Sequence, residues 1–254
     1  MSDITIMGCS RCKTPDSPSC TDALVGGWLK NIVAFPRLKE LDITDIRIGG
    51  PGYAVATRGI PNSSSVCTGL SISNMNHSTY ADGLETLLRS MSALAELVLD
   101  GVIMPRGELK NCIGIVAGTL RLLTINDYYS TENNPQPWED DTVAGLHQLK
   151  ILSLNGVPVT PPLLGMLPPR LEHLRLSRTA LARLPAPILA AWLRRERFPL
   201  RGVLKKFEVI GQLRRGGVKS GLQASAKQVA EISRLCGALG IEWIYKPRIS
   251  PNFF

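Results

Sequence analysis

The chain has 254 residues, of which 44% are hydrophobic and 20% charged, and this composition indicates a folded protein. It contains no apolar run of roughly 18 to 20 residues that could cross a membrane. It also lacks the basic start and apolar run of a secretory signal, so we expect a reduced intracellular setting, cytoplasmic or nuclear, for its six cysteines. The net charge of +8 is local, because residues 171–215 hold eleven Lys and Arg against three acids.

Residues 1–21 are expected to be an irregular segment or the remnant of an earlier repeat, with ITIM as its strand. The pair Cys9 and Cys12 has the spacing of half a zinc site. A structural zinc site needs four ligands, and no second pair stands at a usable spacing, so we favour the repeat remnant and expect no metal. A helix over about 22–34 then leads into the first clear strand.

One phrase, an apolar residue followed by a second three positions later and a third two positions after that, occurs seven times. The copies are Leu38-Leu41-Ile43, Cys67-Leu70-Ile72, Leu94-Leu97-Leu99, Leu120-Leu123-Ile125, Leu149-Leu152-Leu154, Leu171-Leu174-Leu176 and Leu204-Phe207-Val209. They follow one another at steps of 22 to 33 residues. Each phrase predicts a short strand with its three apolar residues buried, and the strands should stack into one parallel sheet.

The stretches between the phrases should return on the other face of the sheet. Apolar residues at helical spacing predict helices at 82–93, 107–118, 187–197 and 225–239, and IEWIY predicts a closing strand after the last of them. Residues 158–169 differ because their five prolines exclude a regular helix, so an extended segment or a single tight turn is expected there.

Three long connections, 44–65, 126–141 and 210–224, each follow a strand and should therefore emerge at one shared edge of the sheet. The first is interpreted either as a flexible insertion or as a functional loop. The second contains Tyr128, Tyr129 and Trp138. Exposed aromatic residues are typical of recognition loops, although Trp138 could equally pack onto the edge of the sheet.

The exposed positions of the predicted strands change in charge along the chain, from acidic through small and polar to basic. Two interpretations stay open, a partner-binding face or a solvated face with incidental charge. The candidate partner-binding residues on this face are Asp42, Asp100, Asn126, Asn155, Arg175 and Lys205.

Catalytic and cofactor motifs are not found. Gly211 and Gly216 have the spacing of a phosphate-binding loop, but Gly217 occupies the position of its lysine. The three histidines belong to separate repeats, with no nucleophile or carboxylate at motif spacing. We therefore expect neither an enzyme nor a bound cofactor.

The phrases LKELDI, LAELVLDG, LRLLTIND, LKILSLNG and LEHLRLS resemble leucine-rich repeats of the long, helix-backed kind. That resemblance implies an α/β solenoid, a right-handed horseshoe with parallel strands on the concave face and helices and irregular segments on the convex face. The array would contain about seven to eight repeats over 22–245, followed by a tail at 246–254. The irregular steps look like the C-terminal array of fungal F-box/leucine-rich-repeat proteins.

The resemblance implies a non-enzymatic module that binds a protein partner on the concave face and at the edge with the long loops. One alternative is the substrate-recognition part of a ubiquitin-ligase F-box adaptor, although no F-box precedes the array in this sequence. Another is a weak binder of nucleic acid or anionic surfaces through the basic residues of 171–215.

Overall fold

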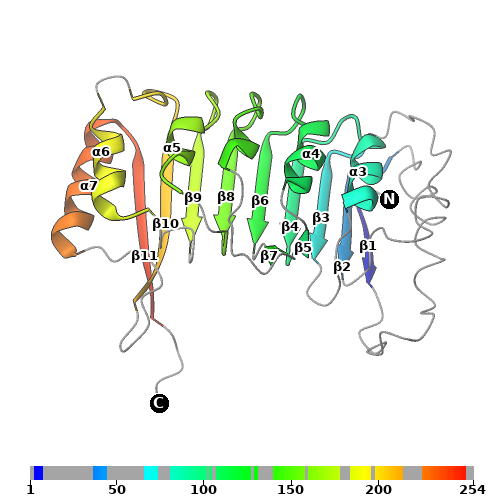
Figure 1. Cartoon of the computed structure of the whole chain (residues 1–254), viewed down its shortest axis with the longest axis horizontal. Coiled ribbons are helices and arrows are strands. Elements are labelled where there is room, and N and C mark those ends of the chain that lie inside the picture. The colour runs from blue at the N-terminus through cyan, green and yellow to red at the C-terminus, as the bar shows by residue number, and fades with distance from the viewer. Residues whose placement is uncertain are drawn as a thin grey trace, which may run out of the picture. The chain divides into compact units, whose positions relative to one another are not determined.

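The computed structural model describes residues 3–7, 37–44, 66–73, 81–101, 103–104, 107–126, 129–130, 140–157, 160–177, 184–195, 198–213 and 225–249. They form an α/β fold with one open, all-parallel sheet of nine strands (Figure 1). In sheet order the strands are β1 (Asp3–Met7), β2 (Glu40–Thr44), β3 (Gly69–Ser73), β4 (Glu96–Asp100), β6 (Leu122–Asn126), β8 (Ile151–Asn155), β9 (His173–Ser177), β10 (Lys206–Leu213) and β11 (Glu242–Ile249). The chain divides into two compact units, residues 1–121 with 127–136, and residues 122–126 with 137–254.

The first unit contains strands β1 to β4, each paired in parallel with the next. Helix α3 (Ala81–Arg89) follows β3 and packs against α4 (Glu108–Ile115), which follows β4 (Figure 1). Two short strands, β5 (Ile103–Met104) and β7 (Tyr129–Ser130), form a separate parallel pair. Strand β1 lies within the N-terminal segment, where ITIM predicts a strand.

The second unit contains β6, β8, β9, β10 and β11, and each of these strands pairs in parallel with the next one in the sheet. The connections include a 3₁₀ turn, η1 (Asp140–Val143), a four-residue helix α5 (Leu163–Met166), and helices α6 (Ala186–Leu193) and α7 (Ala226–Ala238). Helices α6 and α7 pack against each other, and α7 also contacts β11.

The repeated phrases form the core, as the sequence predicts. All twenty-one of their apolar residues are buried, with exposed fractions no higher than 2%. Equivalent positions pair across the strands, so that Leu41 lies beside Leu70 and Leu70 beside Leu97 in the first unit. In the second unit the same row runs from Leu123 through Leu152 and Leu174 to Phe207. Because side chains alternate along a strand, this register places the second and third residues of each phrase on the same face within each unit.

The helices expected from apolar spacing are confirmed, each with a somewhat shorter span, by α3, α4, α6 and α7. In its described part, residues 160–169, the proline-rich return contains only the single turn of α5, in agreement with the expectation for 158–169. Two differences concern the C-terminal part. Strand β10 continues to Leu213, so the connection expected at 210–224 begins later, and β11 reaches Ile249, inside the segment expected as a tail. Both strands extend because they pair with each other over eight residues. The helix expected at 22–34 and residues 45–65 lie outside the described residues.

The short return is held to the preceding one by a buried carboxylate. Asp140 in η1 accepts hydrogen bonds from the backbone N–H of Thr160, at 3.2 Å, and from its hydroxyl. Burial raises the pKa of Asp140, and the two hydrogen bonds from Thr160 oppose that shift. The contact between η1 and α5 therefore substitutes for the helix packing seen in the longer repeats.

Alanine substitutions at two glycines near the end of α7 should change the free energy of unfolding in opposite directions. Gly240 has a φ of +72°, a conformation that costs a Cβ-bearing residue about 1 kcal/mol, whereas Gly237 lies inside the helix with open space around it. We expect Gly240→Ala to lower the free energy of unfolding by about 1 kcal/mol and Gly237→Ala to raise it by about 0.5–1 kcal/mol. Urea titrations of both variants measure this, and equal effects of the same sign would contradict the helix end described here.

Among the described residues, no helix is long and apolar enough to cross a bilayer.

Candidate functional site

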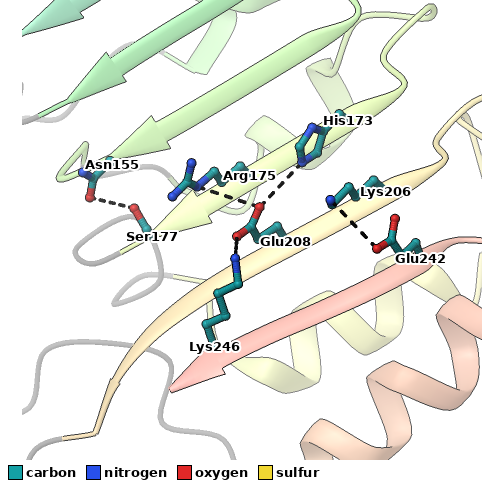
Figure 2. Close-up of polar contacts among 8 residues, drawn as sticks. All are labelled: Asn155, His173, Arg175, Ser177, Lys206, Glu208, Glu242 and Lys246. Carbon is teal, nitrogen blue, oxygen red and sulfur yellow. Dashed lines mark hydrogen bonds and ion pairs between the residues drawn. The ribbon is translucent and has the colours of Figure 1, made fainter. Parts of the chain in front are cut away.

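The face of the second unit's sheet that the helices leave uncovered carries a cluster of charged side chains. We call this the open face; in Figure 2 the charged side chains project from it and the helices lie behind the sheet. Register places Ser153, Arg175, Glu208 and Ile244 in one row across β8 to β11. The row beside it holds Ile151, His173, Lys206 and Glu242, and the row on the other side holds Asn155, Ser177, Ile210 and Lys246.

Glu208 lies at the centre of this cluster and is only 5% exposed. Lys246 Nζ donates a hydrogen bond to Glu208 Oε1 at 2.9 Å. The other carboxylate oxygen, Oε2, lies 3.8 Å from His173 Nε2 and 4.0 Å from Arg175 Nε, both beyond hydrogen-bond range, and only the contact with Arg175 is ionic (Figure 2). Side chains from β9 and β11 therefore surround the carboxylate of Glu208, which extends from β10 on the open face.

These neighbours change the protonation of both central groups. Burial by itself would raise the pKa of Glu208, but the hydrogen bond from Lys246 and the positive charge of Arg175 hold it below its usual value. Burial, and after it the positive charge of Lys206, lowers the pKa of His173, and Glu208 opposes this only in part. At neutral pH the cluster thus contains an ionised Glu208 and an uncharged His173.

Arg175 combines contact with this cluster and access to solvent. Its side chain is 45% exposed, and its 4.0 Å contact with Glu208 is too long to be a hydrogen bond. A guanidinium presents five N–H donors in a planar fork that fits a carboxylate or phosphate. Arg175 can therefore contact Glu208 and still offer donors to an acidic group of a partner.

A second ionic arrangement lies where the strands begin. Glu172 accepts from Lys205 Nζ at 2.5 Å and contacts Lys150 Nζ at 3.1 Å, so one carboxylate bridges two lysines from neighbouring repeats. The hydrogen bonds from Lys205 and then Lys150 lower the pKa of Glu172. The side chain of Lys205 is still 71% exposed. Exposed pairs of this kind contribute little to stability, so they serve mainly to position the lysines.

The predicted site residues of the second unit are partly brought together. Arg175 lies in β9, and Asn155 ends β8, where its Oδ1 accepts a 2.6 Å hydrogen bond from the buried Ser177 hydroxyl (Figure 2). Asn126 ends β6 beside Asn155, and Lys205 directly precedes β10.

Asp42 in β2 and Asp100 at the end of β4 are half-buried members of the first unit. Tyr128 and Trp138 lie outside the described residues. Tyr129 belongs to the backbone of β7.

The basic end of the expected charge gradient requires a correction. Glu208 and Glu242 stand among Arg175, Lys206 and Lys246, so the basic side chains at this end of the open face are paired with acids and do not form a uniformly basic surface. Alternation could have found Glu208, because it lies two residues after Lys206 on the same face of the strand. Alternation could not identify Lys246, because the closing strand predicted from IEWIY ends at Tyr245.

Metal or thiol chemistry finds no support in the described part of the chain. There, no group of three or more His, Cys, Asp or Glu could hold a metal ion. Cys67, Cys112 and Cys236 are thiols, not disulfides, and are buried in the core. Burial raises the pKa of all three thiols, to about 12 for Cys112 and Cys236.

These three cysteines should resist alkylation in the folded protein. Since the thiolate is the reactive form, we expect iodoacetamide at pH 8 to modify them at least about a hundredfold more slowly than in urea. Peptide-resolved mass spectrometry of Cys67, Cys112 and Cys236 measures the rates. A native rate equal to the rate in urea at any of the three would show that the surrounding core is open.

No family model matches the chain, and no curated protein matches it.

Proposed function

We propose that the chain is a leucine-rich repeat solenoid that binds a protein partner on its open face, without catalysing a reaction. The observation that supports this most strongly is the charged cluster around Glu208, in which exposed basic groups are held in place by a nearly buried carboxylate. The finer resemblance, to the repeat arrays of fungal F-box proteins, rests on the sequence phrases alone.

The partner surface we propose is acidic. Arg175, Lys205 and Lys246 all have side chains at least 45% exposed, and each is oriented by a carboxylate of this chain. A partner carboxylate placed beside them would complete charge-assisted hydrogen bonds without ordering long side chains at the moment of binding. Pre-positioned charges of this kind increase specificity and association rate more than affinity.

The basic residues of 171–215 do not favour nucleic acid as the ligand. Arg175 faces the open side of the sheet, Arg194 caps the end of α6 and pairs with Glu231 of α7, and Arg201 lies in the turn before β10. A nucleic-acid site needs a continuous stripe of such residues along one surface. The described basic residues are divided between both faces of the sheet.

A quantitative affinity capture tests the proposal. Cell lysate is passed over the wild-type chain and over Arg175→Glu, with Arg195→Glu as the control, because Arg195 is also exposed but lies just after the end of α6. We expect a set of bound proteins that Arg195→Glu retains and Arg175→Glu loses by at least about tenfold. The proposal fails if both variants retain the same proteins, or if the bound material is nucleic acid removed by nuclease.

A further inference from the structure

Strand β11 leaves one edge available for pairing. Its eight residues pair with β10 on one side, and among the described residues no strand lies beyond it. Glu242 donates its N–H to Lys205 O at 2.8 Å, toward β10. Since consecutive residues of a strand direct their backbone groups to opposite sides, Trp243 and Tyr245 direct their N–H and C=O groups away from β10.

The residues along this edge are complementary to themselves. They read Glu242, Trp243, Ile244, Tyr245 and Lys246, an acid and a base enclosing two aromatic residues around a central isoleucine. We propose that β11 pairs antiparallel with β11 of a second copy of this chain, about a two-fold axis through Ile244. In that register Glu242 lies opposite the second copy's Lys246, and Trp243 opposite its Tyr245.

The backbone geometry agrees with this register. The outward N–H of Trp243 would donate to the C=O of the second copy's Tyr245, and the N–H of that Tyr245 would donate to the C=O of Trp243. The two-fold axis generates the same two hydrogen bonds again, which gives four in all. Ile244 then forms the non-hydrogen-bonded pair on the axis. Pro247 directs its nitrogen outward too and has no N–H to donate, so it ends the ladder at that point.

The side chains of the edge favour the same partner. Glu242 and Lys246 have side chains 61% and 63% exposed and contact Lys206 and Glu208 of their own chain at 3.9 and 2.9 Å. Opposite charges directly across antiparallel strands stabilise the pair, as do aromatic pairs.

Trp243 and Tyr245 are stacked with ring centroids 6.4 Å apart, and both are only half-buried in the single copy. To make the same side-chain contacts, a different partner would have to present an equivalent strand in the antiparallel direction. A second copy of β11 presents it by two-fold symmetry.

A charge exchange tests the side-chain pairing in the full chain. Sedimentation equilibrium between about 1 and 100 µM measures dimerisation of wild type, Glu242→Lys, Lys246→Glu and the double variant, with circular dichroism to confirm folding. Each single variant places like charges opposite each other twice, so we expect the dissociation constant to rise at least about tenfold, and the double variant to return to within about threefold of wild type. Equal affinities for all four proteins would overturn the register.

A disulfide tests the axis without depending on those charges. In a chain whose Cys9, Cys12 and Cys20 are replaced by serine, Ile244→Cys would bring two cysteines to a Cα separation of about 4.5 Å, within the span of a disulfide. Ile210→Cys is the control, because Ile210 lies on the same face but in the interior strand β10. We expect oxidation to give a covalent dimer with Ile244→Cys alone. A wild-type mass of 27.6 kDa at every concentration, or a dimer in which Ile244→Cys cross-links no better than the control, would overturn the proposal.

Discussion

Replacing Trp192 with alanine is expected to lower the free energy of unfolding by about 3–5 kcal/mol, the largest effect of any single substitution considered. Trp192 in α6 is buried at 2% exposure, and its ring meets those of Phe198 and Phe207 edge to face, with centroids 4.8 and 6.1 Å apart. Its Nε1–H donates to Leu164 O of α5 at 3.0 Å. One side chain thus joins two consecutive returns and the strand β10.

Trp192→Phe separates the two contributions. It retains an aromatic ring but leaves the buried carbonyl of Leu164 without its donor, which should cost about 1–3 kcal/mol. Urea denaturation followed by circular dichroism measures both variants. The packing described for α5, α6 and β10 would be contradicted if the alanine variant lost less stability than the phenylalanine variant, or less than about 1 kcal/mol.

Replacing Glu208 with glutamine is expected to lower the free energy of unfolding by about 1–3 kcal/mol at pH 7. The carboxylate is nearly buried among His173, Arg175 and Lys246, and its removal leaves the positive charges of Arg175 and Lys246 without a counter-charge. Glu96→Gln is the matched control, because Glu96 is exposed on β4, and it should change stability by no more than about 0.5 kcal/mol.

The pH dependence of the Glu208 variant follows from the direction of its pKa. Folding lowers the pKa of Glu208 below the usual 4.5, so the folded state binds the proton less well than the unfolded state. Its stabilising contribution is therefore complete above pH 4.5 and is lost as pH falls through the folded pKa. Wild type and Glu208→Gln are denatured at several pH values between 3 and 7. The difference between their free energies of unfolding should become smaller as the pH falls. A difference that stays constant, or grows, would mean that the carboxylate does not ionise as described.

The strands and the core could be predicted from the sequence because a single short pattern determines both. The spacing of Leu152 and Leu154 places both on one side of β8, and Leu149 is buried just before that strand. The other six phrases do the same. The five prolines of the short return excluded a long helix because their rings clash with the preceding turn and they have no N–H to donate, and within the described residues 160–169 only α5 forms.

The site was less accessible to sequence reasoning because its contacts join residues from three different repeats. The number of charges along 171–215 identified Arg175 and indicated a basic region. The register between strands places Glu208 beside Arg175 and Lys246, which a count along the chain does not show. The reach of Lys246 depends on β11 extending past Tyr245, which follows from pairing with β10 and not from the local pattern. Charge arrangement on a sheet face is a property of the register between strands.

Lysine labelling tests the central proposal, binding on the open face, most directly. The protein is treated with an amine-reactive reagent alone and in complex with a partner obtained by affinity capture, and each lysine is quantified by mass spectrometry. Lys205 and Lys246 are exposed on or beside the open face, whereas Lys227 is exposed on α7. We expect the complex to reduce labelling of Lys205 and Lys246 at least about fivefold and to leave Lys227 unchanged. Protection of Lys227 with unchanged labelling of Lys205 and Lys246 would place the partner on the helical face and contradict the account.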